Sequence, residues 1–249
     1  MKKSSFRAFL FLLLLFPTLA NAQLTLSSGL SAAQMASILA GPGVQISNAV
    51  ITSPTNYYSS FNASGTNLGL TNGLLLTTGD FSVAVGPNNQ QGAATVDINP
   101  GDATLQAIAG VNTYDAAVLE FDFIPQNDTI EFKYIFASEE YPEYVCSTYN
   151  DLFGFFISGP GIMGTQNLAI IPGTSTPVAI NAVNSGTSGS NANPNSPCNL
   201  SYSNYYVDNT NGTTIQYDGF TTVLTAFAIV IPCQTYHLKI VVADAGDAD

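Results

Sequence analysis

The chain has 249 residues, of which 9% are charged, with 5 basic and 17 acidic side chains and no tryptophan. Residues 1–22 are typical of a secretory signal peptide, with a basic start, an apolar core and a small-residue cleavage site. Its removal leaves two lysines against seventeen acidic side chains, a net charge of −15 that repels nucleic acid and anionic membranes and favours cations. We therefore predict an exported protein without membrane insertion after signal removal, whose residues 23–249 form a single domain.

The start of this domain is predicted to hold its only helix. Ser31 and Gln34 form a capping-box pattern, good helix formers continue to residue 40, and a Gly-Pro-Gly turn follows. Short apolar runs predict strands over 44–51 and 73–79. The polar, turn-rich stretch between them is expected to hold a weak strand at most.

Regular alternation begins near residue 117. Leu119, Phe121 and Phe123 share one face of a strand, and a second alternating run over 130–136 follows a short turn, which predicts a hairpin. Residues 152–158 are apolar on both faces, as in the central strand of a sandwich. Further short strands are predicted over 166–171, 178–183, 214–217, 220–231 and 236–243, with a polar surface loop over 184–204.

Many short strands without a regular alternation of strands and helices indicate the fold class. We predict an all-β protein, a two-sheet β-sandwich of jelly-roll character with one short N-terminal helix.

The three cysteines, Cys146, Cys198 and Cys233, indicate one disulfide and one remaining thiol in an oxidising compartment. We predict a Cys146–Cys198 disulfide, because the polar insert that carries Cys198 has little else to hold it against the surface. Cys233 instead follows a proline at the end of a predicted strand.

Charged and apolar residues are most closely combined over residues 133–160, where an acidic turn separates two apolar strands. Ca²⁺ takes about 6–8 oxygen ligands, so this turn and the acidic C-terminal segment could share one ion. The predicted ligands are Glu139, Glu140, Asp151, Asp244 and Asp247. Because their spacing does not match an EF-hand, the alternative is that these carboxylates are solvated turn residues.

An enzymatic alternative is glycan hydrolysis, which needs two facing carboxylates. Glu139 or Glu140 with Asp151 is the candidate pair, but a chain without tryptophan lacks the usual aromatic platforms of such sites. His237 is the one histidine, and it shares a solvated strand face with Lys239, which argues against a nucleophilic triad. The sequence therefore favours a non-enzymatic module, with a carbohydrate-binding or glycan-hydrolysing domain as the alternative.

Several specific stretches follow one another in a fixed order along the chain. They are Ser138-Glu139-Glu140-Tyr141, Asn150-Asp151-Leu152-Phe153-Gly154-Phe155-Phe156-Ile157, and the segments 73–80, 86–88, 115–123 and 243–247. Together they resemble the choice-of-anchor L domain, a family of exported bacterial surface proteins. The resemblance implies a cell-surface or secreted location and suggests adhesion, with surface glycans or other surface proteins as partners. Members continue into a last strand and an anchor, so it also implies that this domain is truncated at its C-terminus and is anchored by missing C-terminal regions.

Overall fold

A computed structural model describes residues 23–41, 44–95 and 97–247, so the predicted signal peptide and its cleavage site lie outside the described residues. The strands are β1 (Thr25–Ser27), β2 (Gln45–Thr52), β3 (Tyr58–Asn62), β4 (Asn72–Leu76), β5 (Thr113–Ile124), β6 (Thr129–Tyr134), β7 (Ala137–Ser138), β8 (Leu152–Ser158), β9 (Gln166–Asn167), β10 (Tyr206–Asp208), β11 (Gly219–Thr221), β12 (Leu224–Ile229) and β13 (Tyr236–Ala245). The α-helices are α1 (Ala32–Ala40) and α2 (Ala103–Ala109), with 3-10 turns over Phe81–Ala84 and Ser203–Tyr205.

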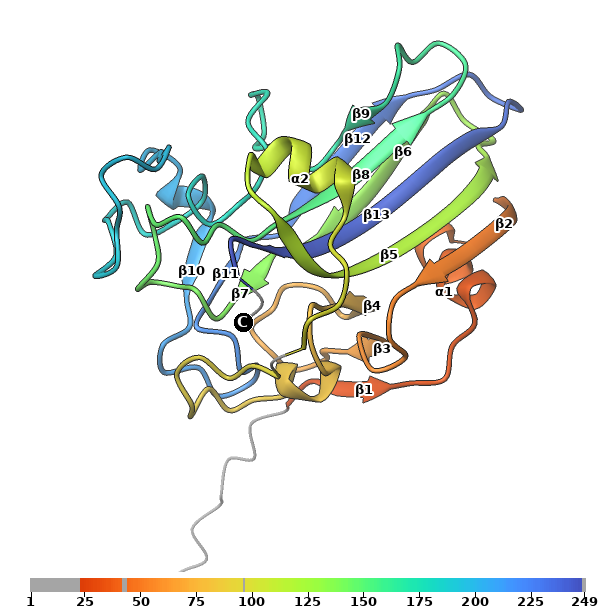
Figure 1. The fold of residues 1–249 in the computed structure, drawn as a ribbon. Helices are drawn as coiled ribbons and strands as arrows, with labels where there is room; N and C mark the ends of the chain where they lie inside the picture. The colour runs from red at the N-terminus through yellow and green to blue at the C-terminus, as the bar shows by residue number, and fades with distance from the viewer. Residues whose placement is uncertain (1–22, 42–43, 96, 248–249) are drawn as a thin grey trace, which may run out of the picture.

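The centre of the fold is an antiparallel five-stranded sheet in the order β2-β5-β13-β8-β9. Leu238 of β13 lies opposite Phe121 of β5 and Ile157 of β8, and all three are fully buried. Every residue of β8 from Leu152 to Ile157 is buried, which confirms the prediction of a central strand apolar on both faces. Figure 1 shows this sheet as the long diagonal layer of the molecule.

A second layer covers one face of this sheet. β12 pairs with β6. Along the chain β6 leads into β7 and β11 leads into β12, and β7 and β11 belong to the small sheet β10-β11-β7. Phe132 of β6 stacks on Phe155 of β8 at a centroid distance of 6.0 Å, so the main core lies between the two layers. Aromatic packing of this kind supplies much of the burial that stabilises such a core.

The hairpin predicted from the alternating runs is wrong. β5 pairs with β2 and β13, whereas β6 pairs with β12, so the short turn carries the chain from one layer to the other. The alternation itself is as predicted, with Leu119, Phe121 and Phe123 buried. Two strands with one apolar face each can bury it side by side in one sheet or face to face across two, and alternation does not distinguish these arrangements.

A third sheet, β1-β3-β4, lies beside the second layer, and α1 packs against β2 and β4. The predicted capping box is present: Ser31 and Gln34 exchange hydrogen bonds, and Met35 is buried. β3 is a five-residue strand, whereas a weak strand at most was expected. Tyr57 and Tyr58 are buried at its start, although the sequence around them is polar.

The prediction of a single helix is also wrong. α2 covers the other face of the five-stranded sheet, where Leu105 packs with Val118 and Val241 (Figure 1). Asp102 caps the helix by accepting hydrogen bonds from the backbone N–H groups of Thr104 and Leu105. With seven residues, the helix is too short to produce a clear periodic pattern.

Four other predicted strands differ from the structure. Residues 178–183 form turns rather than a strand, and their apolar side chains are buried: the N–H groups of Ala182 and Val183 both donate to the carbonyl of Ala179. The strand predicted over 166–171 is limited to β9, the one over 214–217 is reduced to a single bridge at Ile215, and the one over 220–231 is divided between β11 and β12. A buried apolar run does not by itself require strand pairing.

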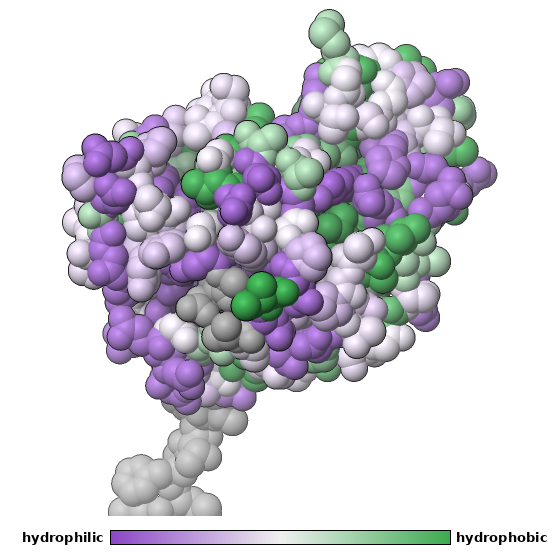
Figure 2. Space-filling model, in the orientation of Figure 1, coloured by the Kyte–Doolittle hydropathy of each residue, from purple (hydrophilic) through white to green (hydrophobic). Residues whose placement is uncertain are grey.

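The described chain is therefore mostly β, built from several antiparallel sheets with short helices, and the jelly-roll character stays a prediction. Figure 2 shows hydrophilic residues over much of one face, interrupted by small apolar groups. No helix within the described ranges is long and apolar enough to cross a membrane.

Candidate functional site

Three neighbouring strands bring carboxylates to the same end of the five-stranded sheet. Asp115 belongs to β5, Asp244 to β13, and Asp151 directly precedes β8. Asp151 and Asp244 alternate with residues of the opposite face, so both point toward the main core, and Asp115, Asp244 and Asp151 are 1%, 4% and 8% exposed. A small cavity of ≈ 80 Å³ lies there, lined by Asp151, Asp244 and Glu139 together with polar groups of Thr78 and Ser138. We call this the acidic pocket.

Asp151 is held by two hydrogen bonds. The backbone N–H of Ala245 donates to its Oδ1 at 3.2 Å, and the hydroxyl of Ser138 donates to its Oδ2 at 3.3 Å. Burial nevertheless raises the pKa of Asp151 to about 7, and the charge of Asp247 adds to this effect.

Asp244 and Glu139 have raised pKa values for the same main reason. Burial, followed by the charge of Asp151, raises the pKa of Asp244 to about 10, although a hydrogen bond from Thr78 opposes the rise. Burial, followed by the charge of Asp218, raises the pKa of Glu139 to about 8, and nearby backbone N–H groups lower it only in part. The pocket therefore gathers acidic groups whose ionised forms are destabilised.

The five predicted calcium ligands do not all reach this cavity. Glu139, Asp151 and Asp244 line it, Asp247 acts on it through its charge, and Glu140 is buried outside the lining. Over residues 23–41, 44–95 and 97–247, no three His, Cys, Asp or Glu side chains converge closely enough to hold a metal ion.

Asp115 is a member of the cluster that the ligand prediction missed. Its Oδ1 accepts hydrogen bonds from Tyr57 Oη at 3.1 Å and from Asn99 Nδ2 at 2.9 Å, and Tyr57 also donates to Asp97 at 2.9 Å. Asp115 adopts a left-handed backbone conformation with φ 50°, which is uncommon outside glycine and frequent at functional sites.

A second polar network lies beside the acidic pocket, beneath the loop over 86–92. Asn88 Nδ2 donates to Asp218 Oδ1 at 2.7 Å and to the carbonyl of Asn209 at 2.8 Å, while Gln216 Nε2 donates to the carbonyl of Gln90 at 2.7 Å. Burial raises the pKa of Asp218. Its charge links this network to the pocket by raising the pKa of Glu139.

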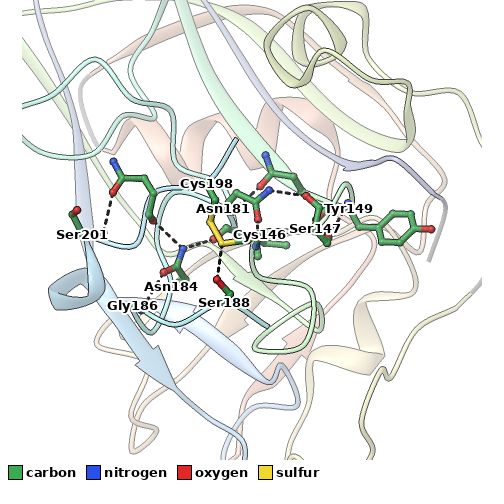
Figure 3. Close-up of a disulfide and its surroundings, with 12 residues drawn as sticks. Cys146, Ser147, Tyr149, Asn181, Asn184, Gly186, Ser188, Cys198 and Ser201 are labelled. Atoms are coloured by element: carbon green, nitrogen blue, oxygen red, sulfur yellow. Dashed lines mark hydrogen bonds between the residues drawn. A yellow bond between two sulfur atoms is a disulfide. The ribbon is translucent and has the colours of Figure 1, made fainter. Parts of the chain in front are cut away.

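The disulfide joins Cys146 to Cys198, the pair expected from the sequence, with a Cα–Cα distance of 5.1 Å (Figure 3). Cys233 is free and exposed. Buried amides hold the same region: Asn181 Oδ1 accepts from the backbone N–H of Cys146 at 2.6 Å, and Asn184 Nδ2 donates to the carbonyl of Asn199 at 3.2 Å. The polar insert has an anchor beyond the predicted cysteine and tyrosines, because the backbone N–H of Asn199 donates to the carbonyl of Asn181 at 2.8 Å.

The remaining candidate for nucleophilic chemistry lies on a solvated strand face. His237 Nδ1 contacts Asp122 at 2.8 Å and its Nε2 contacts Glu120 at 3.5 Å, with about half of the His237 side chain exposed. Lys239 on the same face forms an ion pair with Asp102 at 2.5 Å. The arrangement of His237 matches the solvated strand face expected from the sequence.

These features define an antiparallel β domain with a buried acidic pocket and a disulfide-held polar loop. The chain belongs to the choice-of-anchor L domain family, whose model matches residues 25–249. This membership indicates an exported, surface-associated module. No curated protein and no solved structure matches the chain significantly.

Proposed function

We propose that this domain is a non-enzymatic adhesion module of an exported surface protein, and that Ca²⁺ stabilises it at the acidic pocket. The observation that supports the cation is a cluster of buried carboxylates without a basic side chain beside it. Within the described ranges, Lys239 is paired with Asp102 and Lys133 is exposed on β6. Buried charges need a compensating partner, and a divalent cation would supply it.

The chemistry of the pocket suits a hard cation. Asp151, Asp244 and Glu139 would supply carboxylate oxygens, and the hydroxyls of Thr78 and Ser138 are further oxygen groups in the lining. A bound cation would favour the ionised carboxylates and so displace the protons that burial now favours. Its binding would require these side chains to move closer together than they are.

The dimensions of the pocket support a stabilising role rather than glycan hydrolysis. Its volume of ≈ 80 Å³ is well below the roughly 300–1,000 Å³ of typical small-molecule sites. The raised pKa values of Glu139 and Asp151 do fit a general acid, which keeps hydrolysis or glycan binding at this site as the second candidate. Surface glycans or other surface proteins are the proposed partners.

Thermal unfolding of residues 23–249 in EDTA and in Ca²⁺ tests the proposal. At a hundredfold excess over its dissociation constant, Ca²⁺ should add about 2.7 kcal/mol to the free energy of unfolding. Identical melting curves would contradict the cation. A glycan array and a glycan-hydrolysis screen on the same protein separate the two functions, because turnover that is lost in Glu139→Gln would favour the enzymatic candidate.

A further inference from the structure

A large apolar groove lies next to the acidic pocket. Its volume is ≈ 440 Å³, and two unbroken runs of chain line it: 72–76, which is β4, and 131–137, which leads from β6 into β7. Phe153 and Phe155 of β8 and Ile240 of β13 contribute to the lining from the five-stranded sheet. The groove therefore separates the β1-β3-β4 sheet from the β12-β6 pair.

Among the described strands β4 pairs with β3 alone, so one backbone edge of β4 faces away from any strand partner. The backbone hydrogen bonds from Ala63 to Thr71 and from Thr77 to Tyr57 show that the odd-numbered residues of β4 are the bonded ones. In an antiparallel pair the residues that alternate with the bonded ones direct their backbone N–H and C=O groups away from the partner strand. Those residues are Asn72, Leu74 and Leu76, and all of them line the groove.

β6 has the same property on the other wall. Within the described part of the chain its one strand partner is β12, and the hydrogen bond from Val230 N–H to the carbonyl of Asp128 shows that the even-numbered residues are bonded. Glu131, Lys133 and Ile135 therefore direct their backbone groups away from β12, and all three line the groove. Among the described residues, no backbone hydrogen bond joins these outward groups of β4 and β6 to another segment.

The groove also contains a buried polar group in need of a partner. Tyr134 is 6% exposed, and within the described part of the chain its hydroxyl has no hydrogen-bond partner. Its ring packs on Phe153 and Phe155, which line the groove as well. Such a hydroxyl is costly to bury and favours a ligand that carries hydrogen-bonding groups.

The groove borders the acidic pocket, since the two cavities share five lining residues: Leu76, Phe136, Ala137, Tyr217 and Val242. Both walls lead into that pocket at their C-terminal ends, β4 through Thr77 and Thr78 and β6 through Ser138 and Glu139. The two wall strands therefore run in the same direction. A strand placed between them and antiparallel to both would begin at the acidic pocket.

We infer that this groove binds an extended polypeptide segment that pairs with β4 and β6, buries alternating apolar side chains and places a basic residue near its N-terminal end in the acidic pocket. The open edges supply the backbone partners of a β-strand, and the carboxylates of Glu139, Asp151 and Asp244 supply the complementary charge. A lipid chain could fill the apolar volume but would leave both edges unpaired. The inference names the partner of the adhesion module proposed above and rests on that function; it does not require Ca²⁺, which would compete with the basic residue.

The test uses a fluorescent peptide of about ten residues, a typical strand length, that alternates valine with threonine and begins with two lysines. We expect saturable binding to residues 23–249 by fluorescence anisotropy in EDTA, and weaker binding when Ca²⁺ is added. A control peptide with the lysines at its C-terminal end should bind about tenfold more weakly, because its charges then lie at the far end of the groove. A third peptide, N-methylated at every residue, cannot donate to either edge and should not bind.

A pair of protein variants tests the edge directly. Lys133→Pro removes a backbone N–H that faces the groove, whereas Lys133→Ala keeps it, and the side chain itself is exposed. Lys133→Pro should weaken binding about tenfold relative to Lys133→Ala, as expected for a lost hydrogen bond.

Equal binding by the two Lys133 variants, or retained binding of the N-methylated peptide, would overturn the strand-pairing inference. Preference of the groove for palmitate over the peptide would overturn it in favour of an amphiphile. Cell adhesion that persists when the groove fails to bind peptide would leave the adhesion function standing and reject this partner alone. The comparison with the N-methylated peptide holds even if Lys133→Pro does not fold.

Discussion

The polar insert and the acidic pocket both bury polar groups, but they satisfy them differently. Beside the insert, the amide of Asn181 accepts from Cys146 N–H and donates to the carbonyl of Ser147, so neutral groups satisfy each other. In the acidic pocket, Asp151 and Asp244 raise each other's cost of ionisation, and no basic side chain among the described residues compensates them. Neutral partners therefore satisfy the buried groups beside the insert, whereas burial in the pocket favours carboxylates that carry a proton.

The largest expected effect concerns the insert. Replacing both Cys146 and Cys198 by serine should lower the free energy of unfolding by about 4 kcal/mol, because the disulfide closes a loop with a sequence separation of 52. Urea unfolding measures the change, and Cys233→Ser serves as the control that should alter stability little. The loss should be the same in EDTA and in Ca²⁺. A loss that Ca²⁺ abolishes would show that the two regions are not independent.

The second largest effect is expected at the buried, uncharged amide of Asn181. Asn181→Leu leaves the N–H of Cys146 and the carbonyl of Ser147 without their side-chain partner, at a cost of about 1–3 kcal/mol for each buried group that stays unsatisfied. Asn195→Leu, at an exposed position of the neighbouring insert, is the matched control. Equal urea midpoints for the two variants would contradict a structural role of the buried amide.

A third prediction concerns pH in the absence of metal. Because the pKa of Asp151 rises from 3.8 to about 7 on folding, the native state binds protons more tightly than the unfolded state between these values. The free energy of unfolding in EDTA should therefore fall as pH rises from about 4 to 7 through this group, by at most about 1.4 kcal/mol per pH unit for one proton.

Urea unfolding in EDTA at pH 5 and pH 8 measures this dependence, and Asp151→Asn should reduce it. Added Ca²⁺ should stabilise the protein more at pH 8 than at pH 5, because protons compete with the ion. A wild-type protein that is more stable at pH 8 in EDTA, with Asp151→Asn unchanged from it, would contradict the predicted sign.

The smallest effect is expected at Tyr57. Tyr57→Phe removes the hydroxyl that donates to Asp97 and Asp115, and should cost about 1 kcal/mol. Tyr114→Phe, at the residue that precedes Asp115 in the sequence, is the control. If Asp115 belongs to the cation site, Tyr57→Phe should also weaken the response to Ca²⁺, which a melting curve with and without the ion would show.

Local patterns in the sequence were sufficient for some of these features and not for others. The capping box at Ser31 and the inward face of β5 follow from spacing, because each depends on residues close in the chain. The layer change between β5 and β6 could not be predicted, since alternation specifies a buried face but not the strand that covers it. α2 was missed because seven residues with one strong cap give little periodicity.

The candidate site shows the same limit. Glu139, Asp151 and Asp244 lie together as expected from acidic segments at distant positions in the chain. Asp115 was missed because it lies outside both acidic segments from which the ligands were chosen, and its meeting with Asp244 depends on pairing between β5 and β13. Glu140 was included because it neighbours Glu139 in sequence, although adjacent residues need not line the same cavity.

Calorimetric titration of Ca²⁺ into metal-free residues 23–249 at pH 7.5 or above tests the central claim most directly. We predict saturable binding of one ion that is lost in Asp244→Asn and in Asp151→Asn, while Asp208→Asn, at an exposed position away from the pocket lining, binds as the wild type does. Absence of binding to the wild type, or equal binding by all three variants, would contradict a cation at the acidic pocket and leave protons as the partner of its carboxylates.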